Sequence, residues 1–432
     1  MTKDFQLTTL ANNLTVITEH MPGVRSATIG IWVKRGSRHE PAPLNGICHF
    51  IEHAVFKGTR RRTALDIAIE SDRLGGHLDA YTTHELTAFS MKVCDTGVEQ
   101  AFDLLADMLA HPRFDAEDLE REQRVILEEM KMVEDTPEEH LAELFNTAYF
   151  PKHPLGRPIE GTAKTVPTFD ADHTRRFHQH AYAPANLVIA AAGNITHEQI
   201  LELAARSFGD STSETDTAAP HLEANEAAIE TAPAPAAPIL IRRKKDLEQA
   251  HLILAAPWVS ARHEDRYAAS LLASVIGGGT SSRLWQRVRE ERGLAYSVGA
   301  SGGTYTDTGV FQIYAATSPD TLDEVLDISL QELRRTTREA VGNEELRLVK
   351  DQAISSILLS LESSSARAGT LARQHIVHNR RVTPDEIIAR YEQVTPDDVQ
   401  RVARTYFKTD TLALGALGNL NGFKVDRSRL EI

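Results

Sequence analysis

Residues 182–195 read YAPANLVIAAAGNI, and residues 406–420 read YFKTDTLALGALGNL. Each stretch begins with a tyrosine, continues through an apolar run of strand length and reaches a Gly-Asn pair near its end. A second pair of stretches matches at nearly the same offset: residues 27–34 (ATIGIWVK) and residues 250–257 (AHLILAAP), both followed by Arg-His-Glu. A pattern that recurs at an offset of about 224 residues indicates a chain built of two homologous halves.

The boundary between these halves is marked by a change in composition. Residues 210–238 are rich in Ala, Pro, Thr and acidic residues and show no sustained apolar period, which is typical of a linker. We therefore expect an N-terminal domain at 1–209, a linker at 210–238 and a C-terminal domain at 239–432. Strands and helices mix in each half without a strict strand-helix-strand alternation, which favours an α+β fold with two mixed sheets.

Local signals predict several elements of the first half. Asn12-Asn13 lies between two alternating apolar runs and indicates a hairpin turn, followed by a strand over 26–34. Thr63 before and Gly75-Gly76 after residues 64–74 are start and stop signals of a helix. Strands over 78–82 and 86–93 should follow, and then two helices over about 97–110 and 115–134.

Composition excludes some classes of function. The 432 residues carry a formal charge of -14, which disfavours binding to a nucleic-acid backbone. Neither end has an apolar run of signal-peptide or membrane-span length, so we expect a protein that binds no membrane. The two cysteines, Cys48 and Cys94, are too few for a disulfide framework, and a cytoplasmic location is the expectation.

Residues 49–53, His-Phe-Ile-Glu-His, carry the chemistry of the first half. On a helix, residues at i, i+3 and i+4 share a face, so His49, Glu52 and His53 should project together. Two neutral imidazoles can bind a zinc ion, and a carboxylate beside them can take a proton from a water molecule. An ordinary surface cluster of Glu and His remains the alternative for this motif alone.

A catalytic zinc site needs a third protein ligand. Glu122 and Glu129 lie seven residues apart on one stripe of the charged helix predicted at 115–134, beside apolar Val125 and Ile126. We predict Glu129 as the third ligand and Glu122 as a residue that orients the ligands. The second half has no counterpart, since 270–279 read SLLASVIGGG, and we expect it to be metal-free.

With these residues in place, the sequence resembles the pitrilysin-like (inverzincin, HxxEH) zinc metallopeptidases, and in particular the subgroup of the mitochondrial processing peptidase β-subunit and its bacterial homologues. The stretch HFIEHAVFKGT at 49–59 is similar to the family's HFLEH-x-x-FKGT, and the spacing from His53 to Glu129 matches as well. The resemblance covers nearly the whole chain. It implies a clamshell of two homologous α+β halves around a chamber, with one Zn²⁺ per chain.

The resemblance also implies substrate-binding residues. Arg289 and Tyr296, in VREERGLAY, are similar to the family's Arg and Tyr that contact the substrate, with Tyr296 stabilising the oxyanion. The stretch Asp79-Ala80-Tyr81-Thr82 resembles the edge strand to which the family's peptides add, although the family usually has Asn at the first position.

Three further segments are interpreted without a role in catalysis. Gly277-Gly278-Gly279 suits flexibility or close approach of the backbone. Cys48 is expected to be a small packed residue. The basic run 57–62 is expected to be a solvated loop.

These observations predict a zinc-dependent endopeptidase for peptides or unfolded segments, with Glu52 as general base. Three alternatives stay open: a noncatalytic partner subunit or scaffold of the same fold, a peptide-binding or chaperone-like module, and a metalloenzyme that acts on a different bond. A homodimer and a complex with a related partner subunit are both compatible with the sequence. Cobalt or manganese could occupy the same ligand set.

Overall fold

The computed structural model describes residues 4–209, 232–420 and 422–432. The chain forms two compact units, each assembled from three segments. The first unit comprises Met1–Lys131, Arg157–Thr231 and Leu359–Arg381, and the second comprises Met132–Gly156, Ala232–Leu358 and Val382–Ile432. The predicted linker falls mostly on residues 210–231, which lie outside the described residues, and 232–238 form no helix or strand.

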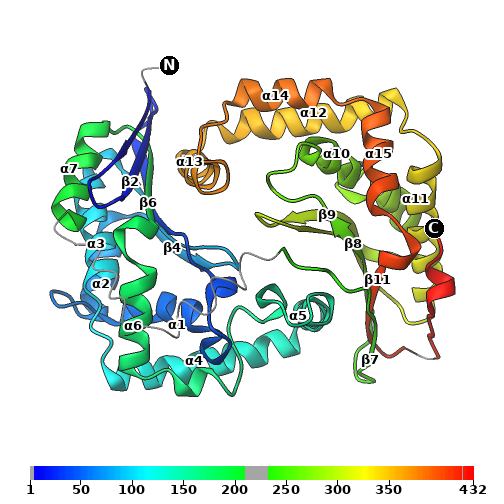
Figure 1. The fold of residues 1–432 in the computed structure, drawn as a ribbon, viewed down its shortest axis with the longest axis horizontal. Helices are drawn as coiled ribbons and strands as arrows, with labels where there is room; N and C mark the ends of the chain where they lie inside the picture. The colour runs from blue at the N-terminus through cyan, green and yellow to red at the C-terminus, as the bar shows by residue number, and fades with distance from the viewer. Residues whose placement is uncertain (1–3, 210–231, 421) are drawn as a thin grey trace. The chain divides into compact units, whose positions relative to one another are not determined.

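The first unit is built on a mixed sheet with the strand order β1-β2-β6-β3-β5-β4 (Figure 1). Its strands are β1 (Phe5–Thr9), β2 (Thr15–His20), β3 (Ser26–Val33), β4 (His77–Thr82), β5 (Thr87–Cys94) and β6 (Leu187–Gly193). β2 and β6 are parallel, and the other neighbours are antiparallel. Asn13 has φ 66° in the predicted turn between β1 and β2, a conformation that Asn tolerates well.

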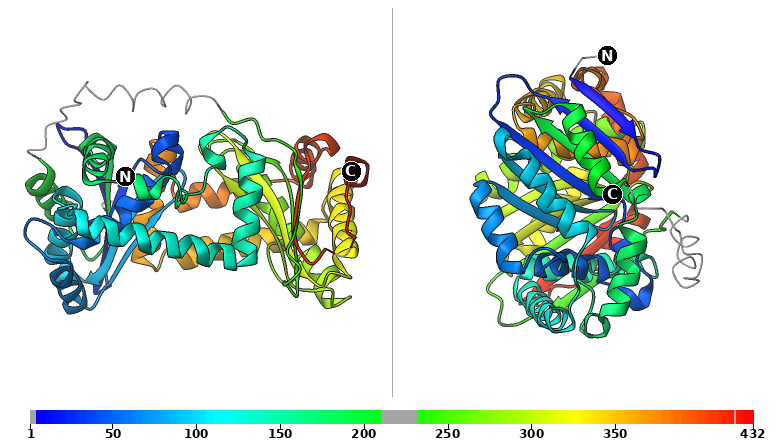
Figure 2. Two further views of the ribbon diagram at one scale, coloured as in Figure 1. Left: turned by 90° about the horizontal axis from the view of Figure 1, so that it is seen from below. Right: turned by 90° about the vertical axis from the view of Figure 1, so that its left-hand side faces the viewer.

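Helices cover both faces of this sheet. The helices of this unit are α1 (Ile47–Ala54), α2 (Ala64–Leu74), α3 (Val98–Ala110), α4 (Ala116–Asp135), α6 (Ala171–Ala181), α7 (His197–Phe208) and α13 (Ser364–His378). α3 and α7 pack on one face of the sheet and α13 packs on the other, and α4 extends past Lys131, where this segment of the unit ends. α2 has the bounds that its local signals predict, because the Thr63 side chain accepts from the Asp66 amide and Gly75 ends the helix at φ 59°. α4 is the long cyan helix in the left-hand view of Figure 2.

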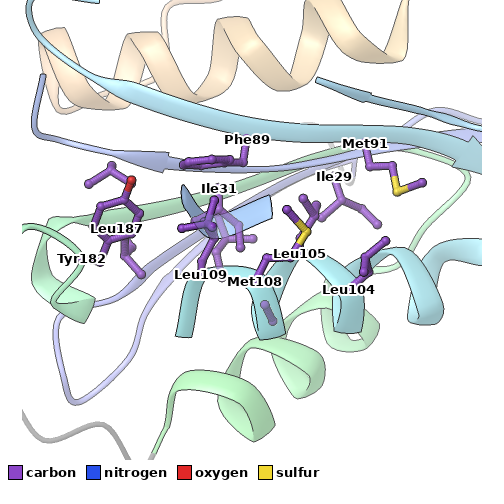
Figure 3. Close-up of a cluster of buried hydrophobic side chains, with 14 of the residues drawn as sticks. Ile29, Ile31, Phe89, Met91, Leu104, Leu105, Met108, Leu109, Tyr182 and Leu187 are labelled. Carbon is purple, nitrogen blue, oxygen red and sulfur yellow. The ribbon is translucent and has the colours of Figure 1, made fainter. Parts of the chain in front are cut away.

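The main core of the first unit lies between its sheet and α3. Figure 3 shows side chains of β3 and β5 facing those of α3: Ile29, Ile31, Phe89, Met91, Leu104, Leu105, Met108 and Leu109. All of these side chains are buried. On the opposite face, Leu371 of α13 packs in a second cluster with Ile17 and Trp32, although α13 comes from the second half of the sequence.

The second unit repeats this plan with the strand order β7-β11-β8-β10-β9. Its strands are β7 (Ile239–Arg243), β8 (Ala250–Trp258), β9 (Ala295–Thr304), β10 (Gly309–Thr317) and β11 (Ala413–Gly418). Its helices are α5 (Pro137–Tyr149), α10 (Arg266–Gly277), α11 (Leu322–Arg338), α12 (Asn343–Ser360), α14 (Pro384–Gln393) and α15 (Pro396–Tyr406), and α12 extends two residues beyond the boundary of the unit.

The repeat predicted from the sequence is confirmed by strand pairing. β3 and β8 are the strands of one pair of matched stretches. β3 lies between β6 and β5, and β8 lies between β11 and β10, and all four of these pairings are antiparallel. β6 and β11 each pair in parallel with another strand, β2 and β7. The domain boundaries at 209 and 239 remain a prediction. The two halves of the sequence exchange helices: α5, from the first half, packs Leu141 and Phe145 on the second sheet, and α13, from the second half, packs on the first sheet.

Within the described part of the chain, no helix combines the length and the apolar character needed to cross a membrane.

Candidate metal centre

The two-turn helix α1 carries three of the predicted site residues. Its apolar side, with Phe50, Ile51 and Ala54, is buried in the first core. The opposite side presents His49, Glu52 and His53, and the centroids of the two imidazole rings are 4.6 Å apart. The i, i+4 spacing therefore places both rings on one face, as the sequence predicts.

Glu129 of α4 brings the third ligand group. Its Oε2 lies 3.8 Å from Nε2 of His49 and 3.7 Å from Nε2 of His53. One ligand atom from each residue lies within 4.8 Å of the others. Oε2 of Glu129 is buried without a hydrogen-bond partner, which is costly unless a cation binds there. Two imidazoles and one carboxylate form a set typical of catalytic zinc, so these residues fit that ion.

The surroundings shift the pKa values of these groups. Burial, followed by the charge of His53, lowers the pKa of His49 to about 3, so its ring is neutral at physiological pH. Burial lowers the pKa of His53, but the hydrogen bond that its ring donates to Glu122 and the charges of Glu129 and Glu52 raise the pKa by more, so the net shift is upward. Burial raises the pKa of Glu129.

Glu122 lies on the same stripe of α4 as Glu129 and contacts His53, one of the candidate ligands. Its Oε2 is 3.4 Å from Nδ1 of His53, and its Oε1 accepts from Nζ of Lys57 at 2.9 Å. The pair of contacts outweighs burial and lowers the pKa of the Glu122 carboxyl, which is therefore ionised. A carboxylate on the second ring nitrogen of a histidine directs the first nitrogen toward a metal. Ile126 is buried as expected on this side, but Val125 is 48% exposed.

Glu52 lies beside the three ligand groups and is held by β4. Thr82 donates a hydrogen bond of 2.5 Å from Oγ1 to Oε2 of Glu52. Burial raises the pKa of Glu52, while the bond from Thr82 and the charge of His53 act in the opposite direction. A raised pKa suits a carboxylate that must accept and release a proton near neutral pH.

β4 is an edge strand of the first sheet, since among the described strands it pairs with β5 alone. Its side chains alternate between the two faces of the sheet. Thr82 and Ala80 are half-buried, whereas Asp79 and Tyr81 are exposed on the opposite face. The Tyr81 hydroxyl accepts a hydrogen bond of 3.4 Å from Nε1 of Trp32.

Arg289 and Tyr296 adjoin one another in the second unit. Arg289 lies on a π-helix (Trp285–Glu290), a rare element that is frequent at functional sites. Its guanidinium lies 4.2 Å from the ring centroid of Trp285 and 4.4 Å from that of Tyr296, and Nη1 donates to the Tyr296 carbonyl. The Tyr296 side chain is 78% exposed on β9, which leaves its hydroxyl accessible to a ligand.

The glycines at 277–279 fulfil the close-approach prediction at one position. A Cβ on Gly277 would lie 2.3 Å from the amide nitrogen of Ala300, so α10 can contact β9 here only through glycine.

The prediction of a solvated basic loop at 57–62 holds only in part: Arg60 and Arg61 are exposed, but Lys57 and Arg62 are half-buried in ion pairs. Lys57 pairs with Glu122, and Arg62 forms ion pairs with Asp103 and the buried Asp107. Acidic side chains on α3 and α4 bind this segment, and their positions depend on tertiary packing that sequence spacing does not reveal. For the same reason sequence reasoning missed Lys57 and the bond between Thr82 and Glu52. Cys48 is buried as predicted.

Fold and centre together define a class of protein: two homologous α+β units, of which one carries an HxxEH motif and a glutamate, Glu129, beside its two histidines. Two family models match the chain. The model described as insulinase (peptidase family M16) matches residues 15–163, and that described as peptidase M16 inactive domain matches residues 168–353. An uncharacterized zinc protease of Streptomyces coelicolor is 40% identical over 397 residues, which are 92% of this chain and 86% of that protein. The chain belongs to peptidase family M16.

Other relatives agree with this assignment. The uncharacterized zinc protease YmxG of Bacillus subtilis is 37% identical over 402 residues, 93% of this chain and 95% of that protein. Among solved structures, a protease from Helicobacter pylori has a TM-score of 0.87 at 22% identity, covering 96% of this chain and 99% of that one. A structure titled peptidase M16 inactive domain, from Pseudomonas fluorescens, has a TM-score of 0.86 at 20% identity, covering 98% and 100%. These two structures support the fold.

Proposed function

We propose that this protein is a zinc-dependent endopeptidase that hydrolyses peptides or unfolded segments of proteins. One observation carries the proposal: His49, His53 and Glu129 bring one ligand atom each to within 4.8 Å of one another, and Glu52 lies beside them. The names of the relatives, which are zinc proteases, support the same metal and the same class of reaction.

When bound by His49, His53 and Glu129, zinc would supply Lewis acidity that polarises a carbonyl and makes a water molecule acidic. Glu52 takes the proton from the attacking water and returns it to the leaving amine. Thr82 holds the carboxylate of Glu52 in one orientation through its short hydrogen bond. Glu122 fixes the ring of His53.

Two groups of residues are proposed to bind the substrate. The free edge of β4 offers backbone N–H and C=O groups to an extended peptide, which is how strand addition provides affinity without a fixed sequence. Asp79, Ala80, Tyr81 and Thr82 would make these contacts. Arg289 and Tyr296 are proposed to bind the substrate through the guanidinium and the exposed hydroxyl.

A noncatalytic subunit of the same fold is the second candidate, and the inactive-domain model that matches residues 168–353 favours it. That match, however, covers none of the residues from His49 to Glu129. A cytoplasmic location and a homodimer or related partner subunit remain predictions.

The test is cleavage of a quenched-fluorescent peptide library by the purified protein, with and without a chelator. Glu52→Gln should abolish cleavage yet keep about one metal ion per chain, because Glu52 is no ligand. Glu128→Gln is the matched control, since the Glu128 side chain is 71% exposed on α4 and pairs with Lys131. Metal binding without cleavage of any peptide would favour the noncatalytic candidate. Folded protein that binds no metal would refute both the ligand set and the peptidase.

A further inference from the structure

The Glu40 carboxylate is fully buried at the start of the helix that carries the metal ligands. It follows the 3-10 turn Ser37–His39, and three hydrogen bonds reach its two oxygens from the start of α1. Oε2 accepts from the Gly46 amide at 2.8 Å and from Nδ2 of Asn45 at 3.1 Å, and Oε1 accepts from the Cys48 amide at 2.8 Å.

These bonds replace a cap that α1 cannot form itself. The N-cap residue is Gly46, at φ 99°, and it has no side chain to accept from the first amides of the helix. Glu40 supplies the acceptor from outside the helix, and its negative charge lies at the positive end of the helix dipole. Burial alone would raise the pKa of Glu40, and the net value is about 7 despite the bonds from Cys48, Gly46 and Asn45, which lower it.

A second segment fixes the same end of α1. Arg157 donates from Nη1 to the Glu40 carbonyl at 2.9 Å, and Nδ2 of Asn45 also donates to the Pro158 carbonyl at 2.9 Å. A Cβ on Gly161 would lie 2.5 Å from the Asn45 carbonyl oxygen, so backbone packs on backbone here. The helix start therefore has little freedom to slide or tilt.

His49 lies less than one turn and His53 about two turns from this anchored end. Each residue of an α-helix adds about 1.5 Å of rise, and functional groups need placement within about 0.5 Å. A slide of α1 by about a third of one residue would therefore move His49 and His53 out of register with Glu129, which belongs to another helix. We propose that Glu40 is a positioning residue of the metal centre: it sets the axial position of α1 and thereby the affinity for the metal. This inference rests on the proposed metal ligands, and it rests on the proposed peptidase activity only for its effect on catalysis.

The experiment compares two buried carboxylates of the first unit. Glu40→Gln puts an amide N–H against N–H donors of α1. Glu19→Gln is the matched control: Glu19 is buried on β2, and its ion pairs are with Arg367 of α13 at 3.0 Å and with Arg381 at 2.8 Å. Metal affinity is measured by competition with a chromophoric chelator at pH 8.5, where the Glu40 carboxylate is ionised, and thermal unfolding is recorded for each variant.

Both substitutions should lower the Tm, but their effects on the metal should differ. We expect Glu40→Gln to weaken metal binding by about tenfold to a hundredfold, as for other residues that support ligands indirectly, and Glu19→Gln to change it less than about threefold. A Glu40→Gln variant with lower Tm and unchanged affinity would show a purely structural role and overturn the proposal. Equal loss of affinity in both variants would do the same.

If Glu40→Gln does not fold, Asn45→Ala tests whether the contacts of Glu40 set the affinity for the metal. It removes one donor to Oε2 and keeps the two backbone bonds, so we expect about a threefold to tenfold loss of affinity. Unchanged affinity in Asn45→Ala would then overturn the proposal. A wild-type protein that binds metal but cleaves no peptide would refute the proposed peptidase function. The comparison of metal affinities between the variants would still test the role of Glu40.

Discussion

Replacing Glu122 by Gln should weaken metal binding without unfolding the protein. Glu122 contacts two groups at once, Nδ1 of His53 at 3.4 Å and Nζ of Lys57 at 2.9 Å, and its side chain is 6% exposed. The Gln oxygen can satisfy only one of these groups, and the Gln amide must then face the other, as a donor against a donor.

The size of the effect follows from the geometry. Substitutions behind a metal ligand typically cost 10–100-fold in affinity, about 1.4–2.7 kcal/mol. The 3.4 Å distance to His53 is longer than an ordinary hydrogen bond of about 2.7–3.2 Å. We therefore expect the lower end, about tenfold.

Competition with a chromophoric chelator measures this affinity, and Glu128→Gln on the same helix is the control, expected to equal the wild type. Lys57, which is 36% exposed, can regain water in the variant, so the Tm should fall by only a few degrees. A Glu122→Gln variant that folds and keeps the wild-type affinity would refute the idea that Glu122 orients His53.

Three further outcomes are expected. Thr82→Val removes a hydrogen bond to a charged group, which is worth about 1.5–3 kcal/mol. The kcat should therefore fall at least about tenfold, while the metal content, measured in parallel, stays constant. An unchanged kcat would contradict a role for Thr82 in holding Glu52. Trp285→Leu removes a cation–π contact of about 0.5–1 kcal/mol with Arg289. The KM for peptides should therefore rise about twofold to fivefold with kcat nearly constant. A KM equal to that of the wild type would argue against substrate binding by Arg289. His178 is buried, and burial lowers its pKa in the folded state to about 4. The folded state therefore binds fewer protons than the unfolded state, and stability falls as the pH drops below about 6.5. The loss of unfolding free energy that His178 causes is about 2 kcal/mol by pH 5. Denaturant unfolding at pH 7 and pH 5 should therefore show a smaller pH effect in His178→Gln than in the wild type. An identical pH effect would exclude His178 as a source of acid sensitivity.

Local sequence signals predicted those features that depend on neighbours in the chain. The bounds of α2 follow from Thr63 and Gly75, and the shared face of His49 and His53 follows from helical spacing. Glu129 lies far along the chain from His53, and its assignment needed the apolar stripe of α4 together with the family resemblance.

The supporting residues were not predictable in this way. Glu40, Lys57 and Thr82 act through partners on other elements, and nothing in their own sequence neighbourhoods marks those partners. Lys57 lies in a basic run that looks solvated, yet the carboxylate that binds it comes from α4. A buried acid such as Glu40 becomes recognisable only when the start of α1 is seen beside it.

The exchange of α5 and α13 has a consequence for synthesis on the ribosome. The last strand of the first sheet, β6, ends at Gly193, whereas α13, which covers one face of that sheet, begins at Ser364. At about 5–20 residues per second, the intervening stretch of about 170 residues takes roughly 10–30 seconds to translate. During that interval Ile17 and Trp32 have no α13 to pack against, and the nascent chain exposes an apolar surface that chaperones can bind. The first unit can thus reach its final packing only when most of the protein has been made.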